Sequence, residues 1–406
     1  MAGEINNYAV FTACNLAYLP KALALAESLR AHDQVRLKIY VFDRKAPLDV
    51  DPALAEILWI EEAGVPGLYN LAFKYDITEF STCLKPSLTL ELLKTYGKVI
   101  YLDPDILMYG SLAPVLRDLE SHPIVLTPHY TTPRSYAKSD SDLAMMRFGS
   151  FNLGFYAVSG AEQALSFLTW WSDRCLRLCF IESQFGLSTD QKWVSIAPCF
   201  FKDLHVSFNP GYNAAFWNAH ERTLSKDAGG RWLVNGSSPL VFFHFSSFHD
   251  EVPADLSTRP FSEKSKKRAD LREIAEEYKL ALAAKKKPGS GPRYAFDYMS
   301  GGEYISQTLR RAYACVQDEL PPGHDPFDSK GPVGAFARRN FLFEKKPSHS
   351  APAGYGEAAA HKGKFAVIYF GMRLVLRLLG ANKFADFSRL LVYLSSYRQN
   401  RGLWKL

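Results

Sequence analysis

The chain has 406 residues, which is enough for one large domain with additions or for two domains. Apolar residues make up 47% of it, as in an ordinary globular protein, and no apolar run reaches the ~18 residues that a membrane-spanning helix needs. The net charge of +6 is modest but uneven, because basic residues gather after about residue 260.

Cysteine usage and the N-terminal sequence both favour a cytoplasmic protein. The six cysteines form no Cys-x-x-Cys pair and no framework pattern, so reduced thiols are expected. The first residues lead directly into a short strand and carry no basic stretch followed by an apolar one, so no signal peptide is expected. No recognised nucleic-acid-binding module accompanies the basic C-terminal region, and nucleic acid is therefore not an expected partner.

Strands and helices alternate along the first 110 residues. This alternation predicts an α/β fold with a mostly parallel, Rossmann-like sheet flanked by helices. There is no Gly-x-Gly-x-x-Gly and no Walker loop, so a bound phosphate would need a metal ion rather than a glycine-rich cradle. The predicted strands are 8–12, 37–43 and 99–102, and the predicted helices are 18–31, 52–58 and 82–96.

Beyond residue 110 the pattern changes more than once. Residues 124–249 predict further mixed α/β structure, and charged helical sequence follows. We therefore predict an α/β domain at 1–250 and a mainly helical extension at 251–320. An irregular, partly disordered segment is predicted at 321–363, and basic amphipathic helices at 364–406.

Two acids follow the predicted strand at 99–102, in the sequence Asp103-Pro104-Asp105. Ligands of open α/β sheets bind at the carboxyl ends of strands. Two carboxylates one residue apart, with a proline stiffening the backbone between them, suit a divalent cation with oxygen ligands. The alternative is a turn in which either acid accepts backbone N–H bonds.

Four later motifs bear on this choice. In their chain order, together with the Asp-x-Asp, they resemble glycosyltransferases of the GT-A type, most closely the family-8-like group, over roughly residues 8–249. The four are Phe151-Asn152-Leu153-Gly154, Thr189-Asp190-Gln191, Asn209 to Asn213 with Trp217 beyond, and His244 at the end of an apolar strand.

The resemblance implies a metal site and a catalytic pair. Asp103, Asp105 and His244 would bind Mn²⁺ or Mg²⁺, which bridges the donor diphosphate; His249 is an alternative ligand. Asp190 and Gln191 would lie beside the anomeric carbon, with helix capping as the alternative role of Asp190.

It also implies residues that contact the donor and the acceptor. Lys85 would face the diphosphate, unless it is a solvated helix residue. The nucleoside would be lined by Thr12, Ala13, Asn15 and Asp43. The sugars would meet Asn152, Gly154, Tyr212, Asn213 and Trp217, of which the two aromatic rings are candidates for stacking.

One departure from the family pattern concerns the phosphates. The family continues His-x-x-Gly-x-x-Lys after the metal-binding histidine, whereas this chain has Ser247 and Asp250 at those positions. The phosphate contact of that lysine is therefore expected from Lys85, or from a basic residue of the 129–150 loop such as Arg134 or Lys138.

The function that the resemblance implies is a metal-dependent, hexosyltransferase-like glycosyltransferase. It would transfer a sugar from a nucleotide sugar, with UDP-sugar expected, to a glycan or lipid-linked acceptor such as a cell-surface polysaccharide. The family-8 likeness implies retention of anomeric configuration. The alternatives are a nucleotidyltransferase that makes the activated sugar and an inactive sugar-binding scaffold.

Residues 364–406 allow two interpretations. One is a helical pair packed on the catalytic domain. The other is a basic amphipathic surface that rests on an anionic membrane, which would make a cytoplasmic enzyme peripheral on the inner face of the membrane.

Overall fold

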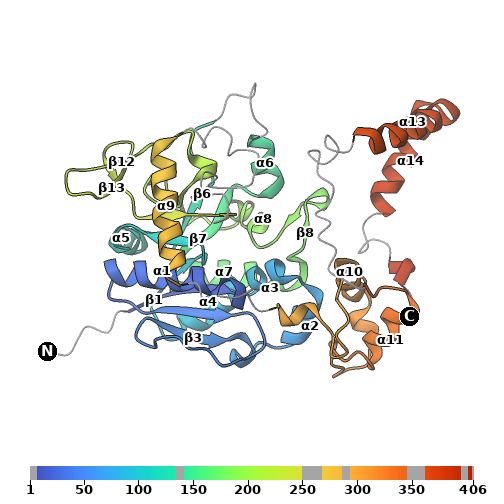
Figure 1. Cartoon of the computed structure of the whole chain (residues 1–406), viewed down its shortest axis with the longest axis horizontal. Helices are drawn as coiled ribbons and strands as arrows, with labels where there is room; N and C mark the ends of the chain where they lie inside the picture. The colour runs from blue at the N-terminus through green and yellow to red at the C-terminus, as the bar shows by residue number, and fades with distance from the viewer. Residues whose placement is uncertain are drawn as a thin grey trace. The chain divides into compact units, whose positions relative to one another are not determined.

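The structure is a computed structural model, and a seven-stranded sheet forms the core of its larger unit (Figure 1). The residues described are 7–133, 141–248, 268–285, 293–344, 362–394 and 401–404. Strand β7 runs antiparallel to β4 and β6, and the other neighbouring pairs of the sheet are parallel. The predicted α/β fold with a mostly parallel sheet is therefore confirmed. The strand order is β10 (Leu204–Val206), β6 (Ile124–Pro128), β7 (Phe151–Ser159), β4 (Lys98–Leu102), β1 (Tyr8–Cys14), β2 (Leu37–Val41), β3 (Ala55–Trp59).

Helices cover both faces of this sheet. On one face, α1 (Leu19–His32) and α5 (Ala113–Ser121) bury leucine and alanine side chains against Ile100 and Leu102 of β4. On the other, α4 (Lys85–Leu93) and α7 (Glu162–Leu178) lie over the alternate β4 residue Tyr101 and its neighbours in β7. The alternation of side chains along each strand thus supplies two separate hydrophobic layers.

Two predicted helices differ from the structure. The helix predicted at 52–58 is wrong, because residues 55–59 form β3 in parallel register with β2. The helix predicted at 82–96 is divided between α3 (Ile77–Cys83) and α4, with Leu84 between them. Here the tertiary pairing of an apolar segment outweighs its local helical pattern.

A smaller three-stranded sheet lies beside the large one. Its order is β11 (Ala214–Ala215), β15 (Phe242–His244), β5 (Ile106–Met108), and β15 pairs antiparallel with β5. Helix α9 (Ala269–Ala283) packs on it through Tyr278, whose ring stacks on Phe245 with centroids 4.0 Å apart. The other helices and strands that accompany these two sheets are α6 (Ser141–Phe148), β8 (Ile181–Glu182), β9 (Leu187–Ser188), α8 (Gln191–Val194), β12 (Leu224–Lys226), β13 (Trp232–Val234) and β14 (Ser238–Pro239).

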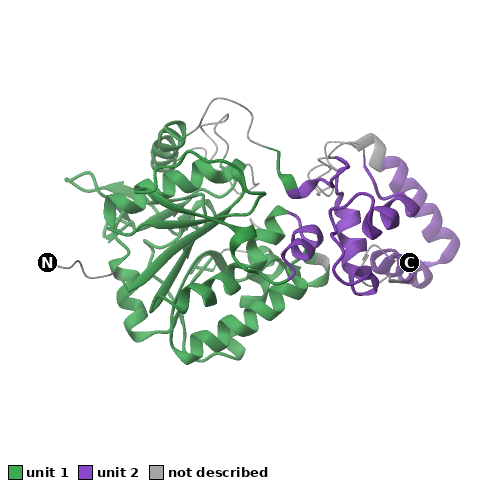
Figure 2. Cartoon of the chain, turned by 90° about the horizontal axis from the view of Figure 1, so that it is seen from below, with its two compact units in different colours: residues 1–66, 77–295 green, residues 67–76, 296–406 purple. Residues whose placement is uncertain are grey.

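Contacts divide the chain into two units: residues 1–66 with 77–295, and residues 67–76 with 296–406 (Figure 2). Helix α9 therefore belongs to the sheet unit, whereas the predicted domains separate it at residue 250. The domain boundaries predicted from the sequence, after residues 250, 320 and 363, stay predictions.

The second unit is helical, and its core is held together by a buried arginine. Arg310 donates to the carbonyl oxygens of Ala72, Phe73 and Tyr75 and pairs with Asp297 at 2.7 Å. Helix α11 interrupts the segment 321–363, so that segment is not irregular throughout. The unit contains α2 (Leu68–Lys74), α10 (Gln307–Val316), α11 (Pro332–Arg339), α13 (Lys362–Leu379) and α14 (Ala381–Leu394). Among the described residues, no helix is both long enough and apolar enough to cross a bilayer.

Candidate functional site

Three predicted metal ligands converge between the two sheets. Asp103 follows β4, Asp105 precedes β5, and His244 ends β15, whose register sets it opposite Ile106. The Nε2 atom of His244 lies 3.0 Å from Asp105 Oδ1 and 3.7 Å from Asp103 Oδ2. One ligand atom from each of the three residues lies within 4.8 Å of the others. Residues more than a hundred positions apart thus form one group.

The Nδ1 atom of His244, on the side of the ring away from the carboxylates, is held by Asn213. Asn213 donates through Nδ2 to Thr127 Oγ1 and Asn152 Oδ1, so its Oδ1 is the atom that faces His244 Nδ1, at 3.2 Å. The Nδ1 atom of His244 therefore has a side-chain oxygen as its partner, and Nε2 is the ring nitrogen that faces the two carboxylates. The ring of Trp217 stands edge-on to the imidazole at 5.0 Å. Such an amide partner is what orients a metal-binding histidine.

The chemistry of these donors fits a divalent cation. Two carboxylates and one imidazole match the hard-to-borderline ligand set that Mn²⁺ or Mg²⁺ takes, with the imidazole favouring Mn²⁺. Burial acts to raise the pKa of Asp105, but His244, together with Lys21 and a backbone hydrogen bond, outweighs burial and lowers that pKa to about 2. The carboxylate is thus ionised at neutral pH. The side chain of Asp103 is 26% exposed against 11% for Asp105, so the group opens to solvent on the Asp103 side.

A buried lysine joins this group to the predicted catalytic pair. Lys85, at the start of α4, places Nζ 3.3 Å from Asp103 Oδ1, 3.4 Å from Asp190 Oδ2 and 3.0 Å from the carbonyl oxygen of Leu153. Its side chain is 4% exposed, so it is not a solvated helix residue. Burial lowers the pKa of Lys85, but the two carboxylates outweigh burial and raise it. The ammonium group is therefore a fixed positive charge between two acids.

Asp103 and Asp190 differ in their surroundings. The hydroxyl of Tyr101 donates to Asp103 Oδ1 at 2.6 Å, so Asp103 has two partners that fix its orientation. Asp190 is buried, and burial raises its pKa, with Lys85 acting in the opposite direction. Its backbone oxygen accepts from the indole of Trp171 at 3.0 Å. Asp190 therefore has a backbone oxygen bonded to Trp171 and a carboxylate whose only cationic partner within the described chain is Lys85.

Strand β7 brings its predicted residues against the same group. Gln191 accepts from Leu153 N at 3.3 Å and donates to the carbonyl oxygen of Phe148 at 3.0 Å, so both ends of its amide bind backbone. Asn152 Oδ1 accepts from Gly154 N at 3.1 Å. A Cβ atom on Gly154 would lie 2.3 Å from Cε1 of His244, so only glycine leaves room for that imidazole.

The predicted nucleoside residues lie at the carboxyl ends of β1 and β2. Thr12 and Ala13 are buried, and Asn15 accepts from Tyr18 N at 3.1 Å at the start of the short helix Leu16–Tyr18. Asp43 accepts from the backbone N–H groups of Arg44 and Ala295. These residues are at the ligand-binding edge of the sheet, and their role in binding a nucleoside stays a prediction.

Tyr212 does not lie where it could stack on a sugar, although the sequence predicts that it does. Its ring is fully buried and stacks on Phe242 with centroids 5.9 Å apart, and its hydroxyl donates to Asp118 at 3.1 Å. A ring in the core cannot stack on a sugar, so this prediction is wrong. His249, Arg134, Lys138 and Asp250 lie outside the described residues.

Two further residues near the acids were missed from the sequence. Lys21 of α1 holds Nζ 4.2 Å from the ring centre of Tyr18, and its charge acts on Asp105 to lower that pKa. Burial raises the pKa of Tyr18, and the carboxylates of Asp105 and Asp103 raise it further. Their signal in the sequence is their place directly after β1, where α1 begins near the ligand-binding edge.

Comparison with known proteins gives two relatives of uncharacterized function. No family model matches the chain. Two Bacillus subtilis proteins named as uncharacterized are similar to it. YfnD is 25% identical over 250 residues, covering 58% of this chain and 76% of YfnD. YfnF is 27% identical over 185 residues, covering 45% of this chain and 60% of YfnF.

Solved structures add a likeness at low identity. A galactosyltransferase, LgtC, in complex with donor and acceptor sugar analogs, is 16% identical, covers 70% of this chain and 98% of its own, and gives a TM-score of 0.44. The glycosyltransferase GlyE of Streptococcus pneumoniae TIGR4 is 18% identical, with coverages of 70% and 66% and a TM-score of 0.39. Both of these structures are named as glycosyltransferases.

Proposed function

We propose that this chain is a metal-dependent glycosyltransferase that moves a sugar from a nucleotide-diphosphate sugar, with UDP-sugar expected, to a glycan or lipid-linked acceptor. The observation that carries the proposal is that one buried lysine contacts both a candidate metal-binding group and a second, buried acid. Asp103, Asp105 and His244 form a candidate cation site, and Lys85 links this group to the buried Asp190. A cation site for the diphosphate with a separate carboxylate nearby for the sugar suits the departure of a diphosphate from a sugar.

In this proposal the cation site serves the leaving group. Asp103, Asp105 and His244 would hold the ion, and a bound Mn²⁺ or Mg²⁺ supplies Lewis-acid stabilisation of the diphosphate charge. Asn213 keeps the Nε2 atom of His244 turned to the acids, while Tyr101 and Lys85 keep Asp103 in place. These residues are preorganised, so little reorganisation is needed when the donor binds.

Asp190 would serve the sugar. As the bond from the anomeric carbon to the diphosphate oxygen breaks, the sugar gains positive charge, and the carboxylate of Asp190 opposes that charge. Both ends of the Gln191 amide are engaged by backbone, which favours Asp190 as the electrostatic partner and Gln191 as the residue that fixes the segment. The acceptor oxygen then bonds to the anomeric carbon, and its proton leaves with the diphosphate. Retention of configuration is the expected outcome.

A thermal-shift panel tests this proposal. The chain is heated with UDP-, GDP- and ADP-sugars in Mn²⁺, Mg²⁺ or EDTA, followed by product analysis with the stabilising donor. We expect one donor class to raise the melting temperature by several degrees in the presence of metal, because a ligand at ~100 times its Kd adds about 2.7 kcal/mol of stability. Equal stabilisation in EDTA would refute the metal assignment. No stabilising donor and no sugar transfer would refute the function.

In the family pattern, a lysine after the metal-binding histidine contacts the donor phosphates. We propose that Lys21 supplies this positive charge in the present chain. We expect Lys21→Met to weaken binding of UDP with Mn²⁺ by roughly 10-fold or more, because one charge-assisted contact is worth about 1.5–3 kcal/mol. Lys21→Arg, which keeps the charge, should retain most of the affinity. Isothermal titration calorimetry measures both, with uridine as the ligand that lacks phosphates. An unchanged UDP affinity in Lys21→Met, or an equal loss for uridine, would contradict this role.

A further inference from the structure

The helices α13 and α14 concentrate the positive charge of the chain. Residues 362–406 carry nine Lys or Arg and one acidic residue, Asp386, a net of +8 against +6 for the whole chain. The rest of the protein is therefore slightly acidic. An excess of this size, confined to one helical segment, marks a surface that attracts anions.

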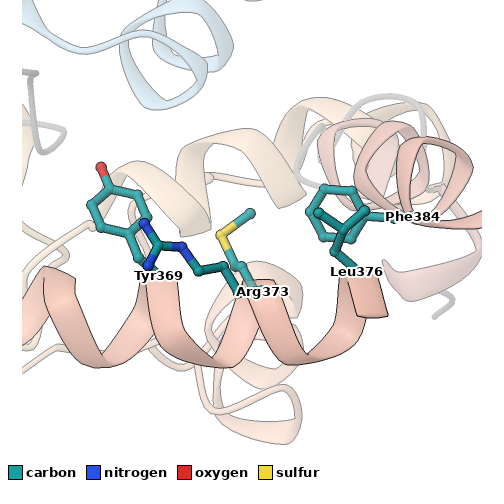
Figure 3. Close-up of a pocket in the computed structure, with 5 residues that line it drawn as sticks. Tyr369, Arg373, Leu376 and Phe384 are labelled. Atoms are coloured by element: carbon teal, nitrogen blue, oxygen red, sulfur yellow. The ribbon is translucent and has the colours of Figure 1, made fainter. Parts of the chain in front are cut away.

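The two helices form a hairpin. They pack against each other and meet at Gly380, whose φ of +76° gives the left-handed turn that ends α13. The inner side of α13 presents Tyr369, Met372 and Leu376 toward Phe384 of α14, around a small hollow (Figure 3). Beyond the hairpin, the short helix Arg401–Trp404 contacts α10, and Trp404 is buried. The short helix after the hairpin is thus held against α10.

The outer side of α13 is apolar and exposed. Val367, Phe370, Leu374 and Leu378 recur at helical spacing, and their exposed fractions are 73%, 70%, 50% and 76%. Their spacing sets them on the face opposite to the hollow. Of the side chains described in α13 and α14, none is buried. Soluble proteins rarely leave a contiguous apolar stripe of this kind uncovered.

Basic residues border this stripe. Arg373 and Arg377 lie one turn apart on α13, between the apolar stripe and the side that lines the hollow, where Arg373 is also a lining residue (Figure 3). Lys383 and Arg389 add positive charge on α14. Long cationic side chains of this kind extend their charged ends to lipid headgroups while the apolar residues enter the headgroup–acyl boundary. Neither helix qualifies as a membrane span. The apolar stripe and the charge together match an anionic bilayer surface.

We infer that the α13–α14 hairpin binds the surface of anionic membranes, with its apolar stripe inserted at the interface and its basic residues on the lipid phosphates. The inference does not depend on catalysis. It selects the membrane interpretation of this segment over a pair packed on the catalytic domain. It also names the surface at which a lipid-linked acceptor would be met.

Co-sedimentation of the full chain with phosphatidylcholine vesicles, with and without phosphatidylglycerol, tests the inference. We expect binding that needs the anionic lipid and weakens at high salt, because exposed charges are screened within about 10 Å at 0.1 M. The variant Arg373→Glu, Arg377→Glu, Arg389→Glu should bind roughly 100-fold more weakly, since each basic residue near such a surface contributes about a factor of five or more.

The matched control removes the same charge elsewhere. Lys94→Glu, Arg177→Glu, Arg231→Glu replaces three exposed basic residues of the sheet unit, whose side chains are 70%, 75% and 83% exposed, and should keep vesicle binding. Circular dichroism checks that both variants are folded. Absence of vesicle binding by the native chain, or equal loss in both variants, would overturn the inference. So would a native dimer that Phe370→Ser with Leu378→Ser converts to monomer while vesicles are not bound, which would assign the stripe to a second copy.

Discussion

Replacing Asp105 with asparagine should abolish the metal dependence of donor binding. The substitution keeps the shape of the side chain and a group facing His244 Nε2, but removes the charge of the more buried of the two acids. Because changes to residues that only support metal ligands already cost about 10–100-fold in affinity, loss of a ligand should cost at least ~100-fold. Titration of Mn²⁺ followed by a donor-dependent thermal shift measures the effect, and sugar transfer should fall with it.

Asp118→Asn is the matched control. Asp118 lies on α5, accepts from Tyr212, and has no proposed role in metal binding. Its variant should bind Mn²⁺ and donor as the native chain does. If Asp105→Asn retains native Mn²⁺ affinity, the ion binds elsewhere, and the group formed by Asp103, Asp105 and His244 is a structural ion pair.

The second large effect is expected from adding a single methyl group at Gly154. In Gly154→Ala the new Cβ would lie 2.3 Å from Cε1 and 2.6 Å from Nδ1 of His244, closer than such atoms approach without displacement. The imidazole must turn away from Asn213 and Asp105. We expect Mn²⁺ affinity to fall by about 10-fold or more, and the free energy of unfolding to fall by about 1–3 kcal/mol as for other overpacked sites. Calorimetric Mn²⁺ titration and urea unfolding measure the two effects.

Gly160, just beyond the same strand, offers the control. A Cβ atom there would meet only the carbonyl oxygen of Gly97, at an ordinary contact distance of 3.7 Å. Gly160→Ala should therefore leave metal affinity unchanged and alter stability by a small amount. Native metal affinity in Gly154→Ala would show that His244 is not held as a ligand.

Much of the fold follows from local patterns, because the alternation of short apolar strands with amphipathic helices is itself the mark of a parallel sheet. The strand that leads to Asp103 and the helix at α1 are examples. A helix is predicted at 52–58, where β3 begins at Ala55, because a short apolar segment fits both the helical and the strand period, and only its pairing with β2 decides between them.

The site was predicted in part, and the limit has a physical cause. Asp103, Asp105 and His244 are recognisable by their positions at strand ends, but their contact depends on the antiparallel register of β15 with β5. Lys85 reaches Asp190 through the packing of α4 on the sheet, which no local pattern contains. Tyr212 was misplaced because a loop-like sequence gives no indication of which way a ring turns.

The arginine that holds the second unit together also constrains how the chain is made. Segment 67–76 belongs to that unit, and three of its carbonyl oxygens accept from Arg310, which is synthesised more than 230 residues later. Until then these polar groups have no native partner, and burying them unpaired is costly. During translation this segment must therefore wait for the C-terminal half. Cutting the chain after residue 295 would not release a complete sheet unit with a satisfied backbone, but one that carries an orphaned helix α2.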